Sequence, residues 1–306
     1  MKALVTGGAG FVGAYLVEKL LAQGNQVVII DDLSSGSKKK VSAKAKLYSA
    51  KIENASEVNE IFAQEKPDVV FHLAAQINAP LSLKEPAFDA QVNIIGSINI
   101  FKAAVDCKCK SIIFSSSAAV YGDTKEIPVT ENTPCEPIAP YGLSKLTAEK
   151  YLWSITKGTQ TRPVALRYSN LYGPGQQLTN GEGGVVPILL NAMLKGEKFT
   201  INGDGSHTRD FIHVSDVADA NIQAATSSAT GLFQISSGQE TTLAKLVEIA
   251  QEASGLKVNL VKGKPRPGDI YRSCLSNAKA KKELNFSPKI KLSDGIKETI
   301  FYYKQN

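Results

Sequence analysis

The chain has 306 residues, of which 43% are hydrophobic and 21% are charged, and these are ordinary values for a folded globular protein. They exclude a disordered or fibrous protein, and the length predicts one large domain or two closely associated ones. No apolar run approaches the ~20 residues of a membrane-spanning helix, and a glycine turn begins at Gly7, too early for a signal peptide.

Charge and cysteine content predict a cytoplasmic protein and leave the class of its ligand open. The 35 basic and 29 acidic residues leave a modest positive excess, which suits an anionic small ligand as well as a nucleic acid. The longest basic run, Lys38–Lys40, lies in a polar loop and is predicted to be solvated, and no nucleic-acid-binding motif accompanies it. Neither the four cysteines nor the three histidines have the spacing of disulfides or of a metal site, so we expect a reduced, metal-free protein.

Short apolar strands alternate with helical segments through the first half of the chain. Strands are predicted at 2–6, 26–30, 47–49, 68–73, 111–115 and 164–167, and the longer helices at 88–105 and 141–156. Several of these strands are apolar on consecutive residues, which is typical of strands buried on both faces of a parallel sheet. The alternation predicts right-handed crossovers and a Rossmann-type, doubly wound α/β fold.

The second half of the chain differs in composition and in the length of its predicted elements. After about residue 169, loops rich in Gly and Pro separate shorter elements, and 232–236 has the composition of one more buried strand. We therefore predict a Rossmann domain at 1–169, to which 211–236 returns, and a smaller, discontinuous α/β domain made of 170–210 and 237–306. This second domain is expected to lie over the carboxyl ends of the strands, where open α/β sheets bind ligands.

A glycine-rich turn joins the first predicted strand to the first helix. Gly7, Gly10 and Gly13 follow the strand at three-residue spacing. Glycines permit a tight turn, close approach of the backbone to a pyrophosphate and close helix–strand contact, and a helix N-terminus presents free N–H groups to an anion. The pattern predicts a dinucleotide site, and the alternative is a tight turn that binds nothing.

The second predicted strand ends in two acidic residues, which favours the dinucleotide. Asp31 lies 18 residues after Gly13, where an acid hydrogen-bonds the adenosine ribose. A carboxylate there would repel the additional phosphate of NADP, so NAD is the predicted cofactor. For Asp32 a capping or turn role stays open.

Three further residues suggest proton transfer. Tyr141 and Lys145 stand at i and i+4 on one face of a predicted helix. A tyrosine with a pKa of ~10 is rarely ionised at neutral pH, and we expect the ammonium and a positive nicotinamide ring to lower that pKa. Such a pair can shuttle the proton of an alcohol–ketone interconversion, and Ser117, which follows an apolar strand, can hydrogen-bond the same oxygen. A surface Tyr–Lys pair and simple turn serines are the alternatives.

Together these motifs resemble the extended short-chain dehydrogenases/reductases, and among them the UDP-glucose 4-epimerase-like nucleotide-sugar epimerases. The resemblance covers nearly the whole chain. It is carried, in chain order, by residues 7–13, 72–75, 114–122, 141–145, 167–174, 203–211 and 266–270.

The resemblance implies an NAD-dependent 4-epimerase of UDP-sugars that passes through a 4-keto sugar. Tyr141 would take the proton of the sugar 4-hydroxyl, assisted by Lys145 and Ser117, while a hydride moves from C4 to the nicotinamide and then returns to the other face of the sugar. Lys145 would also hold the nicotinamide ribose. Family members commonly form homodimers through two helices of each subunit, here 88–105 and 144–156.

The resemblance also implies which residues bind. With Tyr141 and Lys145, the cofactor-binding residues would be Gly7, Gly10, Phe11, Val12, Gly13, Asp31, Asp32, Ile52, Leu73, Ala74, Ala75, Asn93 and Ser115. The substrate-binding residues would be Ser117, Asn170, Arg209, Arg266, Asp269 and Ser273.

Arginine suits a diphosphate because its planar donors engage two oxygens together. The alternative is that Arg209 pairs with Asp210 or Asp216, and Arg266 with Asp269. His72, at the end of a strand, is predicted to be a hydrogen-bonded core residue and not a catalyst.

Two places in the family pattern narrow the chemistry. Related dehydratases and decarboxylases carry acidic residues directly after the catalytic serine or threonine, where this chain has Ala118 and Ala119, so elimination is disfavoured. In related 4-epimerases, the residue four positions after the Arg-Pro-Gly-Asp aspartate borders the C2 substituent of the sugar, and a tyrosine there excludes N-acetyl groups. The small Ser273 at this place predicts that UDP-GlcNAc and UDP-GalNAc are accepted alongside UDP-glucose and UDP-galactose.

Some alternatives stay open. Lys51 stands where relatives carry an acid before the residue that flanks adenine, so Ile52 would act there through its backbone. A UDP-glucuronate 4-epimerase, or another nucleotide-sugar epimerase or reductase of the family, is the second candidate, and a nonenzymatic NAD-binding regulatory protein is the third. The presence of all three of Ser117, Tyr141 and Lys145 favours an enzyme.

Overall fold

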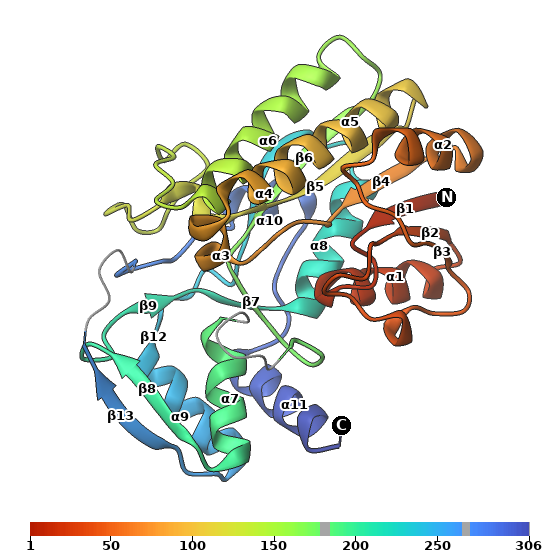
Figure 1. The fold of residues 1–306 in the computed structure, drawn as a ribbon. Helices are drawn as coiled ribbons and strands as arrows, with labels where there is room; N and C mark the ends of the chain where they lie inside the picture. Colours follow the sequence, from red (N-terminus) through yellow and green to blue (C-terminus); the bar gives the residue numbers. More distant parts are fainter. Residues whose placement is uncertain (178–183, 265–269, 306) are drawn as a thin grey trace.

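The computed structural model describes residues 1–177, 184–264 and 270–305, and its centre is a parallel sheet of seven strands (Figure 1). The strand order is β11-β6-β5-β4-β1-β2-β3. The strands are β1 (Lys2–Thr6), β2 (Gln26–Ile30), β3 (Lys46–Tyr48), β4 (Val69–His72), β5 (Ser111–Ser117), β6 (Arg162–Tyr168) and β11 (Gly231–Ile235). The predicted doubly wound α/β fold is confirmed, and each predicted strand boundary lies within two residues of the observed one.

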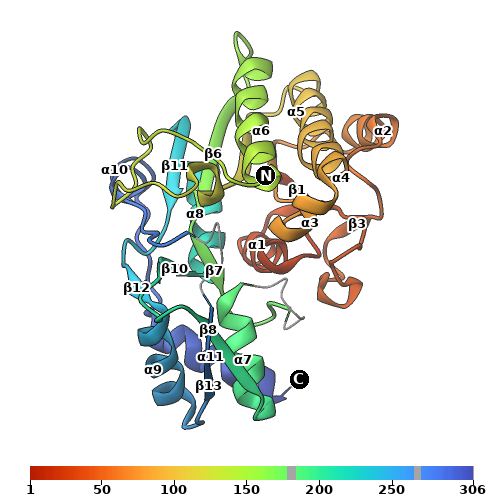
Figure 2. The ribbon, with the colours of Figure 1, turned by 60° about the vertical axis from the view of Figure 1, so that its left-hand side comes forward.

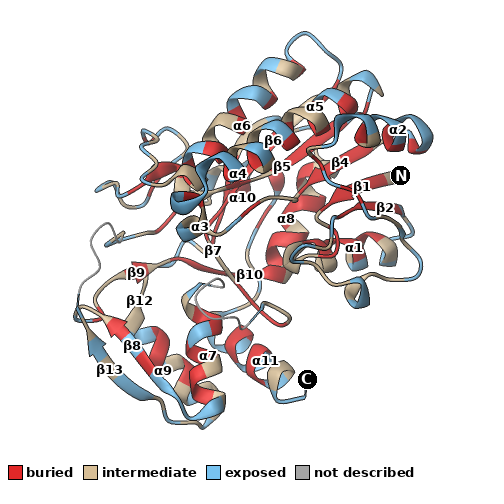
Figure 3. Ribbon diagram, in the orientation of Figure 1, coloured by how far each residue is buried: buried red, intermediate tan, exposed pale blue. Residues whose placement is uncertain are grey.

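Helices cover both faces of this sheet. One face packs against α1 (Phe11–Ala22), α8 (Val214–Thr226) and α10 (Ala278–Leu284), and the other against α2 (Ala55–Glu65), α5 (Ser97–Asp106) and α6 (Pro140–Thr156). In β1, Ala3 and Val5 belong to the first core and Leu4 to the second, because successive strand residues point to opposite faces. The central strands are therefore mostly buried, whereas the edge strand β3 is partly exposed (Figure 3).

The predicted helix at 88–105 is built from three pieces. It consists of α4 (Pro86–Ala90), a π-helical stretch (Gln91–Gly96) and α5, and it follows the short helix α3 (Ala79–Lys84). A Cβ on Gly96 would lie 2.6 Å from the side chain of Ile52, so this part of the helix packs closely against the chain after β3. The wider π turn is a feature that the sequence pattern does not predict.

A smaller lobe follows the carboxyl end of β6 (Figure 2). It has its own apolar core, formed mainly by α7, α9, α11 and the strands beside them. Its elements are β7 (Asn170–Tyr172), α7 (Val185–Lys195), β8 (Lys198–Asn202), β9 (Thr208–Arg209), β10 (Phe211–His213), β12 (Thr241–Thr242), α9 (Leu243–Ser254), β13 (Asn259–Gly263) and α11 (Leu292–Gln305). Three two-stranded sheets form here, which pair β7 with β10, β9 with β12 and β8 with β13.

The chain returns to the large sheet twice. The first return, α8 and β11, lies in the segment 211–236, whose first residues form β10 and pair with β7 of the smaller lobe. The second is α10, whose Ala280 and Leu284, together with Phe286, join the core beneath the sheet. This second return falls inside the segment 237–306 and was not predicted. Within the described ranges, none of the helices is long and apolar enough to cross a membrane.

Candidate active site

The turn between β1 and α1 has the geometry of a phosphate cradle. Gly7 has a φ of +69°, and a Cβ there would lie 2.7 Å from the backbone nitrogen of Ala74. A Cβ on Gly13 would lie 2.0 Å from the carbonyl oxygen of Gly7, so helix and turn meet as closely as a glycine permits. The amide of Ala14 donates to the Gly10 carbonyl (3.1 Å), and the amides of Phe11 and Val12 before it have no acceptor within the helix. Free amides at a helix N-terminus suit a pyrophosphate.

Asp31 lies beside this turn, at the end of β2. Its carboxylate accepts hydrogen bonds from the backbone amides of Ala9 (2.9 Å) and Leu33 (2.8 Å), and burial raises the pKa of Asp31. Two carboxylate oxygens have about four acceptor sites, so ribose hydroxyls can still be bound. Asp32 instead accepts from the amide (3.0 Å) and the hydroxyl (2.6 Å) of Ser34, which is a turn contact.

The basic run after Asp32 forms a short 3₁₀ helix (Lys38–Lys40), and the prediction that it is solvated is wrong for Lys40. This side chain is half-buried, burial lowers its pKa, and its Nζ donates to the carbonyl of Gly175 (2.8 Å). The loop that follows the predicted ribose contact is thereby joined to the start of the smaller lobe.

The residues after β4 pass next to the glycine turn. The amides of Leu73 (3.2 Å) and Ala74 (3.1 Å) donate to the hydroxyl of Thr6, and this brings the segment 73–75 against Gly7. The same hydroxyl pairs with Nδ1 of His72 (2.7 Å), whose Nε2 pairs with Ser97 (2.9 Å). His72 is fully buried and burial lowers its pKa to about 3, so its predicted role as a core residue is confirmed.

Two of the residues that the resemblance assigns to the cofactor already make several contacts within the protein. The Asn93 amide group accepts from the backbone of Gln76 (2.8 Å) and donates to Gln76, to Asp89 and to the hydroxyl of Ser144. Ile52 is buried beneath Gly96, and its carbonyl accepts from Asn99 (3.0 Å).

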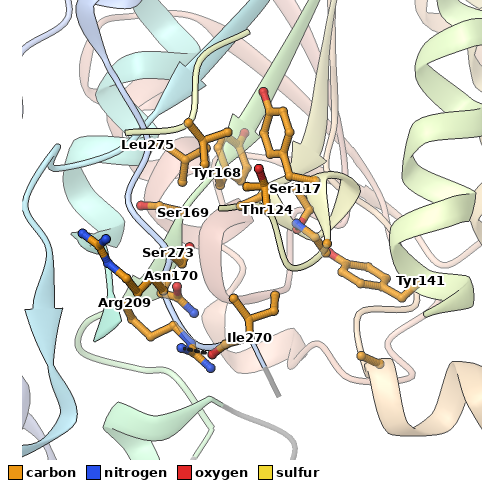
Figure 4. Close-up of a pocket in the computed structure, with 17 residues that line it drawn as sticks. Ser117, Thr124, Tyr141, Tyr168, Ser169, Asn170, Arg209, Ile270, Ser273 and Leu275 are labelled. Carbon is orange, nitrogen blue, oxygen red and sulfur yellow. Dashed lines mark hydrogen bonds between the residues drawn. The ribbon is translucent and has the colours of Figure 1, made fainter. Parts of the chain in front are cut away.

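A cavity of about 240 Å³ opens at the carboxyl ends of β5 and β6 (Figure 4). Tyr141 lies on one side of it and Arg209 on the opposite side, with Ser117 between them. Asn170 and Ser273 also line it, so the cavity brings together five of the predicted site residues, which come from elements far apart in the chain.

Not all predicted contacts are described. Arg266 and Asp269 lie outside the described residues. Arg209 donates from Nη1 to the carbonyls of Thr208 (2.7 Å) and Ile270 (2.8 Å). Asp210 and Asp216, the alternative partners of Arg209, accept hydrogen bonds from backbone amides instead.

No group of three or more His, Cys, Asp or Glu side chains that could hold a metal ion forms in the described ranges.

Tyr141 lies in the first turn of α6, which begins at Pro140. The amide of Tyr141 has no acceptor within the helix and donates to the hydroxyl of the buried Ser82 (3.1 Å). A side-chain hydrogen bond with Ser117 lowers the pKa of the Tyr141 phenol. The phenolic oxygen and the Ser117 hydroxyl therefore lie together at the wall of the cavity.

Lys145 is buried one helical turn after Tyr141. Its Nζ donates to the carbonyl of Ser115 (2.8 Å) and lies 5.1 Å from the ring centre of Phe114. Burial lowers the pKa of Lys145 to about 8.

The structure corrects one expectation about this pair. In the protein chain by itself the pKa of Tyr141 is raised and not lowered, because burial outweighs the opposing hydrogen bond with Ser117. The charge of Asp89 raises this pKa further.

Several residues around the site were missed by sequence reasoning. Arg272 lines the cavity next to Ser273 and forms a bidentate ion pair with Glu240 (2.6 and 2.7 Å), which also accepts from the hydroxyl of Thr208 (2.5 Å). Asp89 is another, since nothing in its helical segment marks a buried carboxylate.

Known proteins match this chain over nearly its whole length. Residues 3–235 match the family model described as the NAD dependent epimerase/dehydratase family. The UDP-glucose 4-epimerase of Thermotoga maritima, solved with UDP-glucose, is 38% identical with a TM-score of 0.96, and the match covers 100% of this chain and 99% of that one. The UDP-N-acetylglucosamine 4-epimerase of Methanobrevibacter ruminantium, solved with UDP-N-acetylmuramic acid, is 34% identical with a TM-score of 0.93, and the match covers 99% and 98%. The UDP-glucose 4-epimerase of Thermus thermophilus, solved with NAD, is 33% identical with a TM-score of 0.93, and the match covers 99% of each chain.

Proposed function

Since this chain belongs to the NAD-dependent epimerase/dehydratase family, we propose that it is a 4-epimerase that interconverts UDP-glucose and UDP-galactose, and also UDP-GlcNAc and UDP-GalNAc. The observation that carries this proposal is the cavity in which Ser117 and Tyr141 face Asn170 and Arg209. A proton-transfer pair on one side and polar groups for a nucleotide sugar on the other are what a UDP-sugar epimerase requires.

Members of this family depend on NAD, and the residues present fit that cofactor. The turn from Gly7 to Gly13 would hold the pyrophosphate through the free amides of α1, Asp31 would accept the adenosine ribose hydroxyls, and Lys145 would reach the nicotinamide ribose. When bound, NAD supplies the oxidant that accepts a hydride from the sugar and later returns it.

The chain itself supplies the proton transfer. The sugar 4-hydroxyl would take the place next to Ser117 and Tyr141, so that its proton passes to the phenolate while the carbon is oxidised. The proton returns from Tyr141 to the oxygen when the 4-keto sugar is reduced on its other face. In the proposed reaction, a charged Lys145 one turn away would favour the phenolate that the first step requires, against the effect of burial, which raises the pKa of Tyr141.

The cavity wall argues against elimination chemistry. Loss of water or carboxylate from a 4-keto sugar requires groups that exchange protons with the neighbouring carbons. Among the described residues that line the cavity there is no Asp or Glu, and Ala118 and Ala119 occupy the wall directly after Ser117. Alanine exchanges no proton, so epimerisation is the chemistry that these residues support.

The proposed substrate range includes UDP-sugars with an N-acetyl group. Ser273 lines the cavity, and its small side chain leaves room beside the sugar for an N-acetyl group. To test this substrate range, the NAD-loaded protein is incubated separately with UDP-galactose, UDP-GlcNAc and UDP-glucuronate. The products are then identified by NMR. We expect turnover of the first two; turnover of UDP-glucuronate alone would replace the proposal by the uronate alternative, and no turnover of any would refute it.

We also propose that the two lobes bind different ligands. Residues 1–169 with 211–236 would bind NAD, since they hold the glycine turn and Asp31. Residues 170–210 and 237–306 would bind the nucleotide sugar, since Asn170, Arg209 and Ser273 come from these segments.

A homodimer is the assembly we propose. Large apolar side chains are exposed along the two helices that the resemblance assigns to the dimer: Phe88 on α4, Ile95 on the π turn, and Leu143 and Tyr151 on α6. Pairing α4–α5 and α6 with the same helices of a second copy would bury them. Sedimentation velocity should give a dimer for the protein and a monomer for Ile95→Glu, whereas a monomeric parent protein would refute the assembly.

A further inference from the structure

We propose that Ser82 of α3 is a positioning residue of this site, which caps α6 from outside that helix and thereby holds Tyr141 in place. The inference rests on the proposed function, because it concerns the proton-transfer residue. Ser82 belongs to none of the motifs that the sequence shows, and its side chain does not line the cavity.

The helix α6 begins without a cap of its own. The first backbone N–H groups of a helix have no acceptor within it, and a Ser, Thr, Asp or Asn side chain at the N-cap usually accepts one of them. In α6 the N-cap is Ala139, whose side chain accepts nothing, and Pro140 after it has no N–H. The amide of Tyr141 is therefore the first donor, and its acceptor has to come from outside the helix.

Ser82 supplies this acceptor. The Tyr141 amide donates to Oγ of Ser82 (3.1 Å), and the hydroxyl of Ser82 donates to the carbonyl of Ala79 (2.7 Å). A hydroxyl has one donor and two acceptor sites, so both bonds form together. Ser82 is 0% exposed, so solvent has no direct access to this hydroxyl. The bond to its own helix thus orients the Ser82 oxygen toward α6.

Both bonds of Ser82 end at residues of the cavity wall. Ala79 and Tyr141 line the cavity, and Ser82 joins them without lining it. The helix α3 is itself capped, because Oδ1 of Asn78 accepts from the amide of Leu81 (2.9 Å). Ser82 therefore belongs to an element with its own cap, and it connects that element to the start of α6.

The place of Tyr141 within α6 makes this cap important for the reaction. Helix ends fray before the interior does, and Tyr141 lies in the first turn, whereas Lys145 lies one turn further along. Loss of the cap should therefore displace Tyr141 and leave Lys145 in place.

The first turn of α6 also packs closely on the segment that follows Ser117. A Cβ on Gly142 would lie 2.4 Å from the carbonyl oxygen of Ala119. Since the phenol of Tyr141 shares a hydrogen bond with Ser117, a shift of this turn changes the geometry of the groups that transfer the proton. Small displacements of reacting groups reduce rates strongly.

The test compares three variants of the NAD-loaded full-length protein. Ser82→Ala removes the cap. Thr156→Val is the matched control, because it removes a buried hydroxyl from the last residue of the same helix, where it donates to the Leu152 carbonyl (2.7 Å). The third variant adds Ala139→Ser to Ser82→Ala. Position 139 has the extended backbone of an N-cap (φ −135°, ψ 152°), so a serine there would cap α6 from within.

The first readout is the exchange rate of the Tyr141 amide by NMR, which does not require turnover, and the second is steady-state kinetics with UDP-galactose. In Ser82→Ala we expect this amide to exchange about fivefold faster, as is typical of a lost cap. The kcat should fall about tenfold or more, while KM stays within about twofold because the substrate-binding residues are unchanged. Thr156→Val should leave both readouts at the parent values, and the double variant should recover them.

A parent exchange rate or a parent kcat in Ser82→Ala overturns the proposal, as does an equal loss in Thr156→Val or a double variant without recovery. Ser82→Cys, which keeps the volume and weakens the acceptor, replaces the alanine variant if the latter does not fold. If the parent protein epimerises no UDP-sugar, the proposed function fails, while the exchange rates still decide whether Ser82 caps α6.

Discussion

Glu149 and Arg167 form a bidentate ion pair under the candidate active site, with Nε and Nη2 of the arginine 2.8 and 2.6 Å from the two carboxylate oxygens. The hydroxyl of Ser116 donates to the same carboxylate, and the guanidinium lies 4.7 Å from the ring centre of Tyr121. Glu149 is two turns after Tyr141 on α6, while Ser116 and Arg167 belong to β5 and β6. The pair therefore fixes the helix that carries Tyr141 and Lys145, the predicted proton-transfer residues, over the two strands that end at the cavity.

Substitution of Glu149 by Gln should destabilise the fold severely. It leaves the Arg167 charge buried without its partner, which typically costs about 3–5 kcal/mol of the free energy of unfolding. Asp106→Asn is the matched control, since it breaks the exposed Lys102–Asp106 ion pair, where a change below about 0.5 kcal/mol is expected. Urea denaturation measures both, and similar free-energy changes in the two variants would contradict the structural role of the buried pair.

Replacement of Tyr141 by Phe tests the proton-transfer step. It removes the phenolic oxygen that Ser117 contacts and keeps the ring, so kcat should fall by about 10²–10⁴ while bound NAD is retained. Tyr151→Phe removes a hydroxyl from an exposed position of the same helix and should leave kcat unchanged. Turnover of UDP-galactose at the parent rate by the Tyr141 variant would rule out this tyrosine as the proton-transfer group.

The glycine turn can be tested without turnover. A Cβ on Gly13 would lie 2.0 Å from the Gly7 carbonyl, so Gly13→Ala should displace the turn and abolish the NAD that is released when the purified protein is denatured. Gly24, unlike Gly13, has a positive φ (+78°), but no atom lies within 4 Å of its Cβ position. Gly24→Ala should therefore cost about 1 kcal/mol of stability and retain NAD. Normal NAD content in Gly13→Ala would show that the cofactor does not need this close contact.

The strands were predictable because their signal is local. Continuous apolar runs such as those of β1 and β2 identify strands covered on both faces, whatever packs against them. The glycine turn and the spacing of Tyr141 and Lys145 are likewise contained in a few consecutive residues. This explains why the strands of the sheet, and the position of Tyr141 and Lys145 one turn apart on a helix, could both be predicted from the sequence.

Features that depend on packing were not predictable. A carboxylate on an amphipathic helix is usually solvated, whereas Asp89 is buried and accepts hydrogen bonds from Gln76 and Asn93, which the helical pattern does not show. The close contact between Gly96 of the π turn and Ile52 joins residues that are distant in sequence. The raised pKa of Tyr141 likewise follows from burial, whereas the sequence shows only the lysine one turn away.

The width of the cavity beside Ser273 controls the predicted substrate range. Ser273→Tyr should reduce kcat/KM for UDP-GlcNAc by more than about tenfold, because a large ring at this wall of the cavity occupies the space of the N-acetyl group. The kcat/KM for UDP-galactose should change much less. Steady-state assays with both substrates check this, with Ser276→Tyr, at a position that does not line the cavity, as the control. An equal loss for the two substrates would mean that Ser273 does not border the C2 substituent.

The pH dependence of the reaction should have an alkaline limb set by Lys145. Burial lowers the pKa of this lysine from its ordinary 10.5 to about 8, so in the folded protein the ammonium is present below pH 8 and is lost as the pH rises through that value. Since the charged form favours the Tyr141 phenolate, kcat/KM should fall above about pH 8 in the NAD-loaded protein. Lys145→Arg keeps its charge at every accessible pH, so whatever activity it retains should not decline over pH 8–10. The rate profile between pH 6 and 10 for both proteins decides the question. A limb that is identical in the arginine variant would assign it to another group.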